Sequence, residues 1–303
     1  MRIFILQRNN LIKRIFLALL CLSFFFLQGC GLIDYGEYNL HKEKAYANAD
    51  ELFIEFIDVG QGDSELIIFP NGKSMLIDTG EYYAFSSVSA ALKRENIVSL
   101  DALIETHPHS DHMGGMSKII EEFKPKTLYM PDVKSEEAAY LGLLEAINES
   151  KTNVVFISAG SEISLDDAVS VKVLSPALSE YENENDYSAV IRTEFLNTSF
   201  LFMGDAENAA EEELLKSGQT LKSSVIKLGH HGSETSSSKE FLSEVSPKYA
   251  VISCGKNNDY GHPHKSTLTI LDELKIKYFR TDEDGSIIML SNGSAIKTIT
   301  PEK

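Results

Sequence analysis

A six-residue segment concentrates side chains that bind metal ions. It reads His107-Pro108-His109-Ser110-Asp111-His112 and follows the apolar run 102–104. Side chains two positions apart at a strand end lie on one face, so His107 and His109 can bind one cation. Asp111 and His112 would then reach a second cation from the turn that follows. Imidazole and carboxylate bind Zn²⁺ and, with more oxygen donors, Mn²⁺ or Fe; a solvated, His-rich loop is the alternative.

This segment resembles the HxHxDH motif of the metallo-β-lactamase superfamily, whose largest group is the binuclear hydrolases. The resemblance implies an α/β fold of the four-layer αββα type, with the metal site at one edge where two sheets meet. It also implies a cofactor of two divalent metal ions per chain, Zn²⁺ or Mn²⁺.

Two further apolar runs deliver a carboxylate at their ends. Leu76-Ile77 precedes Asp78, and Leu201-Phe202-Met203-Gly204 precedes Asp205. Without the resemblance, Asp78 would be a cap or turn residue and Asp205 the N-cap of a helix at 207–216. The resemblance implies instead that Asp78 lies beneath the site and orients its ligands. It implies that Asp205 bridges two cations, which two-metal hydrolases hold about 3.5–4 Å apart.

Two adjacent histidines follow another apolar run, in the segment Lys227-Leu228-Gly229-His230-His231-Gly232-Ser233. The superfamily places its last metal-binding His at such a point. We expect His231 to bind the second cation and His230 to face the substrate, with the reverse assignment as the alternative. Lys227, Ser233 and His230 would stabilise negative charge that develops on a phosphoryl group. The catalytic residues are then His230 and Asp111. Besides binding metal, Asp111 would orient the nucleophile.

Many members of the superfamily have another His ligand ahead of the bridging Asp, where this chain reads Glu184-Asn185-Asp186-Tyr187-Ser188-Ala189-Val190. This departure, together with the motifs at 58–63, 76–80, 107–115, 204–207, 230–233 and 260–263, resembles the extracellular hydrolase domain of the ComEC-type competence family and its free-standing relatives. The resemblance covers about residues 52–291.

The resemblance leaves several residues near the site without a fixed role. Asn185, Asp186 or a water would complete the shell of the first cation. His262 would contact phosphate, or would be a solvated loop residue. Gln61 and Asp63 are expected to be turn residues, with a place in the pocket lining as the alternative.

Strand and helix patterns alternate from residue 52 onward. The apolar segments 52–59, 64–69 and 74–78 predict a meander of three strands. Helices are predicted at 84–95, 116–123, 136–148, 207–216, 239–244 and 267–274. Further strands are predicted before His107 and at 127–130, 154–157, 169–174, 189–196, 200–203, 224–228, 249–254, 278–281 and 286–290. The pattern is that of one mixed α/β domain, at 51–303.

The N-terminal residues predict export. Basic residues precede the apolar run 15–27, which is shorter than the about 20 residues that a membrane span needs, so 1–29 is expected to be a secretory signal peptide. Leu27-Gln28-Gly29-Cys30 resembles a bacterial lipobox, which implies a lipid on Cys30 and a flexible tether at 30–50. The enzyme would then face the outside of the cell membrane, held by lipid only. Ordinary signal cleavage or an uncleaved anchor are the alternatives.

Charge and cysteine content constrain the function further. The formal net charge of the whole chain is −17, which argues against a general electrostatic footprint for nucleic acid, so metal and a few local cations would have to hold any polyanionic substrate. Loss of the signal and lipidation of Cys30 would leave Cys254 as a lone cysteine, expected to be a buried strand residue.

These observations predict a secreted, lipid-anchored, binuclear metal-dependent phosphodiesterase. A metal-bound water with a pKa lowered toward about 7 would be the nucleophile. The expected partner is a phosphodiester, either single-stranded DNA or a wall polymer, and no protein partner is predicted. A teichoic-acid phosphorylcholine esterase is the second hypothesis, and a non-catalytic surface binding protein is the third.

Overall fold

The computed structural model describes residues 45–178 and 180–300. The chain from Ala45 onward forms one compact unit. The predicted signal peptide, Cys30 and most of the predicted tether lie outside the described residues. Among the helices that are described, none has the length and apolar character to cross a membrane.

The first sheet has eight strands in the described part of the chain, ordered β14-β13-β1-β2-β3-β4-β5-β6. Neighbours from β14 to β3 pair antiparallel, which includes the predicted meander. Neighbours from β3 to β6 pair parallel, and parallel neighbours need crossover connections, commonly helices. The strands are β1 (Leu52–Phe56), β2 (Glu65–Ile68), β3 (Ser74–Ile77), β4 (Ala102–Ile104), β5 (Thr127–Met130), β6 (Asn153–Phe156), β13 (Ile287–Ser291) and β14 (Ile296–Ile299).

The second sheet has six strands within residues 45–178 and 180–300, ordered β12-β11-β10-β9-β8-β7. It begins with an antiparallel meander from β7 to β9 and continues parallel from β9 to β12. The two sheets therefore share one plan, a meander followed by parallel strands. The strands are β7 (Val169–Ser175), β8 (Val190–Phe195), β9 (Thr198–Phe202), β10 (Val225–Lys227), β11 (Tyr249–Ile252) and β12 (Lys277–Arg280).

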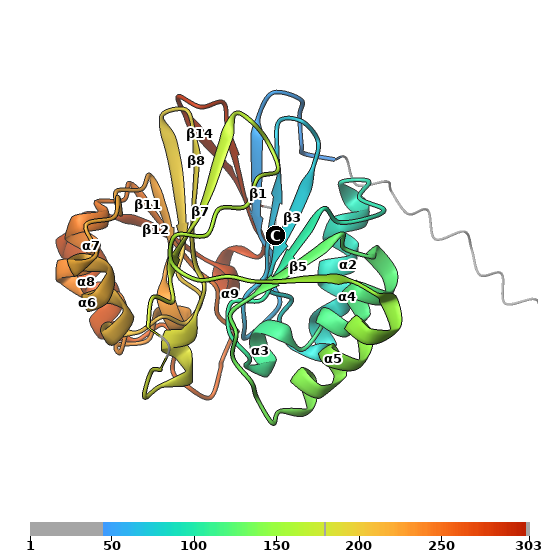
Figure 1. Ribbon diagram of the computed structural model, residues 1–303. Coiled ribbons are helices and arrows are strands. Elements are labelled where there is room, and N and C mark those ends of the chain that lie inside the picture. Colours follow the sequence, from blue (N-terminus) through green and yellow to red (C-terminus); the bar gives the residue numbers. More distant parts are fainter. Residues whose placement is uncertain (1–44, 179, 301–303) are drawn as a thin grey trace, which may run out of the picture. The chain divides into compact units, whose positions relative to one another are not determined.

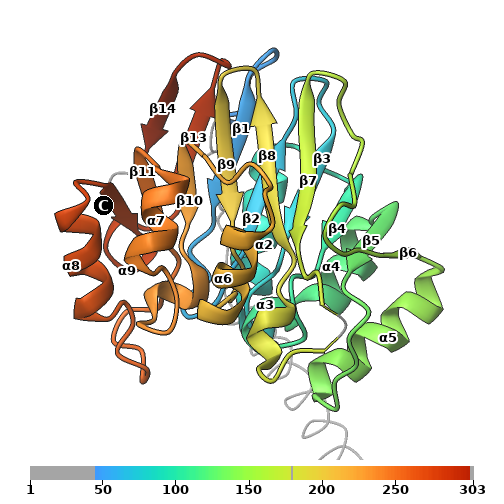
Figure 2. The same ribbon diagram turned by 60° about the vertical axis from the view of Figure 1, so that its left-hand side comes forward.

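Helices cover the outer face of each sheet. Figures 1 and 2 show α2 (Phe85–Arg94), α4 (Met116–Phe123) and α5 (Ala138–Ser150) on the first sheet, and α6 (Asn208–Lys216), α7 (Lys239–Val245) and α8 (Lys265–Glu273) on the second. Short helical turns lie in the connections: η1 (Tyr82–Ala84), α3 (Ser110–Met113), η2 (Glu184–Tyr187), η3 (Gly229–Gly232) and α9 (Thr281–Asp284).

Three apolar cores separate the four layers. One lies between the first sheet and its helices, one between the two sheets, and one between the second sheet and its helices. Strands such as β1, buried along its whole length, therefore carry apolar residues on both faces, as strands covered on both sides do. The predicted αββα sandwich is confirmed.

The core between the sheets should make a large contribution to stability. Phe202 on β9 is fully buried and its ring centroid lies 6.0 Å from that of Phe56 on β1. We expect Phe202→Ala to lower the free energy of unfolding in urea by about 3–5 kcal/mol, because it leaves a cavity between the layers. Val98→Ala is the control, since Val98 is 85% exposed and its truncation should cost less than about 0.5 kcal/mol. Equal effects of the two changes would contradict the assignment of this core.

Most predicted elements are present, and several differ at their ends. α4 and β5 match their predicted bounds, whereas α5 begins at Ala138 instead of residue 136. β14 was not predicted, although Asn292-Gly293 marks a hairpin between it and β13, and Gly293 has φ +81. The short helix α3 was also missed because it lies within the metal-binding motif itself.

Candidate metal centre

The candidate metal centre is assembled at strand ends from both sheets. Asp78 follows β3 and His107 follows β4, and these two strands are parallel neighbours in the first sheet. Asp205 follows β9 and His231 follows β10, which are parallel neighbours in the second sheet. Parallel strands place their carboxyl ends at the same edge of a sheet, so distant residues of the chain meet there.

Four side chains converge with the spacing of one coordination shell. Asp111 Oδ2 lies 3.1 Å from His231 Nε2, and His112 Nε2 lies 3.2 Å from Asp205 Oδ1. The other Asp205 oxygen is 3.4 Å from His231 Nε2. Ligand atoms held tetrahedrally at about 2.1 Å from a Zn²⁺ are about 3.4 Å apart, so these atoms fit the second predicted cation.

Unsatisfied buried atoms support this fit. His112 Nε2 and Asp205 Oδ1 are both buried and have no hydrogen-bond partner among the described residues. A buried polar atom without a partner costs free energy unless water or an ion satisfies it. A divalent cation between the two side chains would remove that cost.

Asp78 orients one of these ligands. Its Oδ2 lies 2.8 Å from His112 Nδ1 and accepts a 2.6 Å hydrogen bond from Thr106 Oγ1. Its Oδ1 accepts from the Thr106 backbone N–H at 2.9 Å. Because the Nδ1 atom is held in this way, the Nε2 atom of His112 faces Asp205. Asp78 therefore lies where the orienting role expected of it requires.

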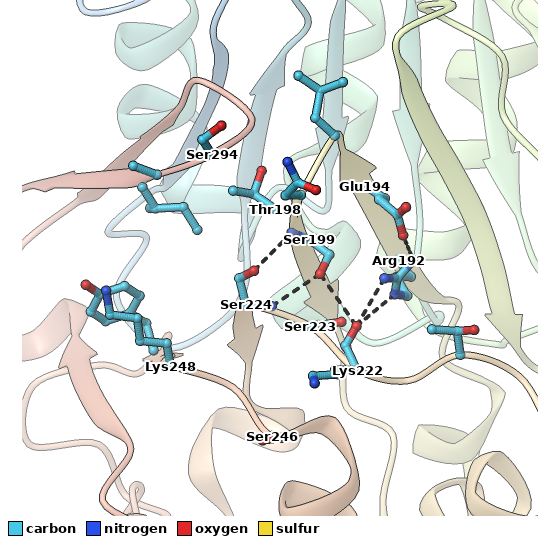
Figure 3. Close-up of a pocket in the computed structure, with 16 residues that line it drawn as sticks. Arg192, Glu194, Thr198, Ser199, Lys222, Ser223, Ser224, Ser246, Lys248 and Ser294 are labelled. Atoms are coloured by element: carbon cyan, nitrogen blue, oxygen red, sulfur yellow. Dashed lines mark hydrogen bonds and ion pairs between the residues drawn. The ribbon is translucent and has the colours of Figure 1, made fainter.

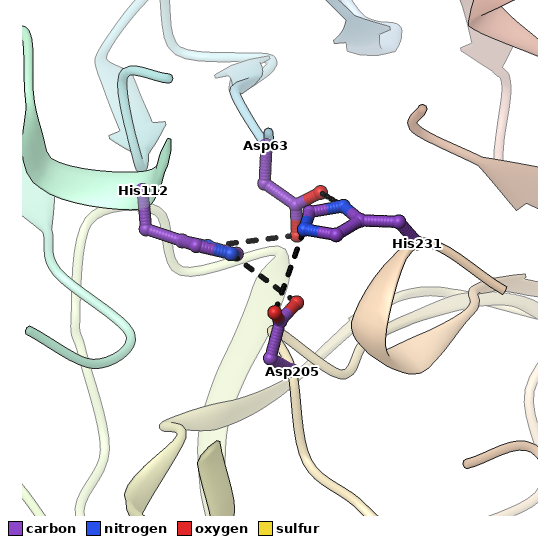
Figure 4. A group of neighbouring side chains, drawn as sticks. All are labelled: Asp63, His112, Asp205 and His231. Carbon is purple, nitrogen blue, oxygen red and sulfur yellow. Dashed lines mark ion pairs between the residues drawn. The ribbon is translucent and has the colours of Figure 1, made fainter. Parts of the chain in front are cut away.

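Asp63 belongs to the centre, although we expected a turn residue. It forms a buried cluster with His112, Asp205 and His231, whose ligand atoms all lie within 4.8 Å of one another (Figure 4). The Asp63 oxygens lie on the Nδ1 side of the rings, 3.2 Å from His231 Nδ1 and 3.8 Å from His112 Nδ1. Asp111 lies on the Nε2 side. Asp111 is therefore positioned as a metal ligand, whereas Asp63 is positioned to contact the Nδ1 atoms, on the side of the imidazole rings away from the cation.

The other two histidines of the motif face each other. His107 Nε2 and His109 Nδ1 are 3.0 Å apart, and the His107 ring centroid is 4.2 Å from that of His112. His107 is fully buried, whereas His109 is partly exposed. The two nitrogens are therefore placed to share the first predicted cation, next to the group that fits the second.

Residues expected near the first cation are only partly found there. Asp186 Oδ1 accepts hydrogen bonds from the backbone N–H groups of Glu207 and Ala210, at 3.0 and 3.3 Å. Asp186 thus caps the first turn of α6, and its expected place in the metal shell is corrected. Asn185 Nδ2 donates to Glu207 Oε1 at 2.9 Å, while its Oδ1 atom is buried and has no partner among the described residues.

Glu184 was missed by sequence reasoning. Its Oε2 atom lies 3.1 Å from His109 Nε2. It occupies the stretch where many members of the superfamily have a further His, so a carboxylate approaches the first pair of histidines from there. The sequence feature that could have identified Glu184 is its position next to Asn185 and Asp186, the two residues that were considered as ligands.

The two adjacent histidines after β10 take different places. His231 is fully buried in the cluster, and its Nδ1 lies 3.0 Å from the Ser253 carbonyl oxygen. His230 is partly exposed, with Nδ1 2.8 Å from Glu207 Oε1 and Nε2 3.8 Å from Asp205 Oδ2. Both have positive φ angles, +47 and +53, a strained conformation for residues other than glycine.

His262 approaches from another loop, with its ring centroid 5.2 Å from that of His230.

Lys227 and Ser233 do not have the places expected of substrate contacts. Lys227 is fully buried, and its ammonium donates to Asp63 and, at 3.0 Å, to the Gly204 carbonyl. Ser233 is also buried, and its hydroxyl pairs with Thr235 Oγ1 at 3.0 Å. Both residues support the loops of the site, and neither is open to a substrate.

The buried charges of the centre are strongly coupled. Burial lowers the pKa of His112, but Asp205, Asp111 and Asp78 together raise it well above the usual value. Burial raises the pKa of Asp205, and His231 and His112 lower it well below the usual range. Burial and the positive charge of His112 lower the pKa of His107. The carboxylates thus already balance positive charge at the point where a cation fits.

Another pocket lies at the opposite ends of the same strands. It has a volume of about 490 Å³ and is lined by residues around the starts of β9, β10 and β11, including Arg192, Ser199, Lys222, Ser224 and Lys248 (Figure 3). Arg192 donates to the Lys222 carbonyl oxygen and to Glu194. No residue of the metal centre lines this pocket.

Comparisons with known proteins agree with this geometry. Residues 57–256 match the model of a family described as "Metallo-beta-lactamase superfamily". The chain is similar to ComE operon protein 3 of Bacillus subtilis, at 33% identity over 77% of this chain and 32% of that protein. It is also similar to Competence protein ComA of Neisseria gonorrhoeae, at 32% identity over 78% of this chain and 32% of that protein.

A solved structure shares the fold. The metallo-beta-lactamase fold protein YhfI from Bacillus subtilis matches with a TM-score of 0.53 and 9% identity, over 79% of this chain and all of that one. The chain spans about a third of the length of the two curated relatives.

Proposed function

The chain belongs to the metallo-beta-lactamase superfamily, and on that basis we propose that it is a binuclear metal-dependent phosphodiesterase that acts on nucleic acid. The superfamily fold with its Asp/His cluster supports a metal-dependent hydrolase. The observation that carries the proposal is the convergence of Asp111, His112, Asp205 and His231 at the spacing of one cation's ligands, beside the facing pair His107 and His109.

The residues of the centre have two roles in hydrolysis, to hold the cations and to orient the attacking water. Two bound divalent cations would supply a hydroxide near neutral pH, because they lower the pKa of water from about 15.7 toward 7. The fully buried His107, His112, Asp205 and His231 hold a fixed geometry, while the Asp111 side chain remains 25% exposed. Its carboxylate can therefore accept a hydrogen bond from the attacking water and orient it toward the phosphorus.

His230 can act on the substrate side of the centre. Its side chain is 25% exposed and its Nε2 lies 3.8 Å from Asp205. In the protonated ring Nδ1 donates to Glu207 Oε1, 2.8 Å away, and Nε2 can then donate a hydrogen bond to a phosphoryl oxygen or a proton to the leaving group. Burial lowers the pKa of His230, an effect that Asp205 and Glu207 oppose.

Nucleic acid is the substrate class that the resemblance to the ComEC-type competence family implies. One of the similar proteins is named a competence protein, and a role of this chain in competence is part of the proposal. The missing family His, replaced here by Glu184-Asn185-Asp186, argues against β-lactam hydrolysis.

We further propose that the enzyme is exported and anchored by lipid on Cys30, at the outer face of the cell membrane, on the strength of the motif at 27–30.

The proposal predicts hydrolysis by the purified, metal-loaded protein. We expect Mn²⁺ or Zn²⁺ to activate cleavage of single-stranded DNA or RNA, measured by release of shorter fragments, with Asp205→Asn as the blank. Release of choline from teichoic acid, with DNA left intact, would replace the nuclease by a phosphorylcholine esterase. Binding of fewer than one cation per chain, together with no cleavage of any phosphodiester, would indicate a non-catalytic binding protein.

A further inference from the structure

Two exposed tyrosines flank the candidate metal centre. Tyr83 lies in η1 on the side of the first sheet, and Tyr260 lies in the loop between β11 and α8 on the side of the second. Their exposed fractions are 67% and 66%. Scattered exposed apolar side chains are ordinary, but those gathered at one place mark a binding surface.

Tyr83 lies beside the loop that carries Asp63. A Cβ atom added at Gly60 would be 3.9 Å from the Tyr83 hydroxyl, and the Asp63 backbone N–H donates to the Asp111 carbonyl at 3.2 Å. Burial, followed by the charges of Glu81 and Asp111 and by Tyr260, raises the pKa of the Tyr83 hydroxyl. Tyr83 is therefore within electrostatic reach of both the catalytic carboxylate and the other tyrosine. No other residue of 45–178 and 180–300 stacks on its ring.

Tyr260 is connected to the centre through histidines. Its ring stacks on His262, with centroids 5.6 Å apart and an angle of 21° between the planes. The His262 ring is 5.2 Å from that of His230 and 6.1 Å from that of His231. The exposed ring of Tyr260 is thus one side chain away from the group that faces the substrate.

A cavity next to this stack offers room for a substrate group. It has a volume of about 470 Å³, and its lining includes His262, Lys256 and Asn257. His262 is 8% exposed, and its Nδ1 atom is buried without a hydrogen-bond partner in the described chain. Lys256 forms no ion pair with any described residue. The cavity is therefore lined by the unpaired cation of Lys256 and by His262, and its Arg280 is paired with Asp282 and Glu283 of the same lining.

We propose that Tyr83 and Tyr260 are specificity-determining residues that stack on the bases of an unpaired strand, on either side of the scissile phosphodiester, with the nucleotide next to Tyr260 in the cavity beside His262. This inference rests on the proposed function. Every base has a π face, so such stacking is tolerant of sequence but requires bases that are not paired in a duplex.

Stacking also resolves the conflict between an acidic chain and a polyanionic substrate. A formal net charge of −17 opposes the electrostatic attraction that usually provides affinity for nucleic acid. Two aromatic rings give affinity that does not depend on charge. A sugar-phosphate or polyol-phosphate strand without bases would gain nothing from them.

The test compares two strands that differ only in their bases. We expect Tyr83→Ala and Tyr260→Ala each to raise KM for an oligothymidylate by about tenfold, with a smaller change in kcat, and to leave KM for an abasic strand of equal length unchanged. Tyr83→Phe and Tyr260→Phe should keep the wild-type KM, because the ring remains. Tyr82→Ala is the matched control: Tyr82 is 58% exposed, but Lys118 Nζ lies 3.9 Å from its ring centroid.

Fluorescence anisotropy of the same two strands, dye-labelled and bound to proteins with Asp205→Asn, gives a readout without turnover. Equal weakening of both strands by the alanine variants, or an equal effect of Tyr82→Ala, would overturn the inference. Loss of phosphorylcholine binding with no distinction between the strands would also overturn it, because the rings would then bind a quaternary ammonium group. If the wild type cleaves both strands while the tyrosine variants do not distinguish them, the proposed function survives and the inference fails. If the wild type cleaves neither strand, the proposed function fails and the anisotropy alone decides the inference.

Discussion

Asp205→Asn should remove most of the activity while the protein stays folded. The substitution keeps the shape of the side chain but removes the charge that faces His112 Nε2 at 3.2 Å and His231 Nε2 at 3.4 Å. Loss of a group that only orients a ligand typically costs 10–100-fold in metal affinity or activity. Loss of a carboxylate that contacts ligands from both sheets should exceed that range, to about a thousandfold in kcat/KM. Elemental analysis should find less than the wild-type metal content.

Asp186→Asn is the matched control for this experiment. Asp186 is also a buried carboxylate close to the site, but it caps α6 through the backbone of Glu207 and Ala210. Its substitution should cost about 1 kcal/mol of stability and leave the metal content unchanged. If Asp205→Asn kept both the cations and the activity, or if the two variants behaved alike, the bridging role of Asp205 would be wrong.

Lys227→Met should be the most destabilising single change near the centre. The ammonium group of Lys227 is the partner of Asp63, and both side chains are fully buried. Removal of one member of a buried ion pair leaves an uncompensated charge and typically costs about 3–5 kcal/mol. We expect a loss of this size in the free energy of unfolding by urea.

A double-mutant cycle separates the ion pair from the packing of the side chains. Asp63→Asn combined with Lys227→Met removes both charges, so the double variant should recover much of the stability that Lys227→Met loses. It should not recover metal affinity, because Asp63 also lies 3.2 Å from His231 Nδ1. The exposed pair Lys216 and Glu212, with side chains 74% and 70% exposed, provides the control, since Lys216→Met should cost less than about 1 kcal/mol. Additive losses in the cycle would contradict the coupling of Asp63 and Lys227.

The apolar pattern predicted one mixed α/β domain, and the family resemblance implied its four layers and most of the groups that meet at the centre. The periodicity of apolar residues was sufficient for α4 and β5, whose bounds match. Asp205 and His231 both follow an apolar strand, but their roles came from the resemblance, since the local pattern alone would make Asp205 a helix N-cap. The resemblance to a known family then supplied the order in which these strand ends meet.

The places of Asp63 and Lys227 could not be predicted in the same way. They are 164 positions apart in the chain, so neither local pattern contains its partner. A lysine at the end of an apolar strand is equally compatible with a solvent-facing role and with a buried ion pair. Burial, which decides between them, arises only when the loop before β2 packs against β10. The same reason explains Asp186, whose partners belong to the start of α6.

The left-handed backbone at His230 and His231 has a consequence for the whole molecule. Glycine or asparagine would adopt φ angles of +47 and +53 with less strain, whereas histidine carries that cost in its backbone. In return both imidazoles approach Asp205 from adjacent positions, with Nε2 of His230 and of His231 at 3.8 and 3.4 Å from its Oδ2 atom. Backbone strain and site geometry are thus opposed at this turn, and the strain persists because the surrounding structure holds the turn in place.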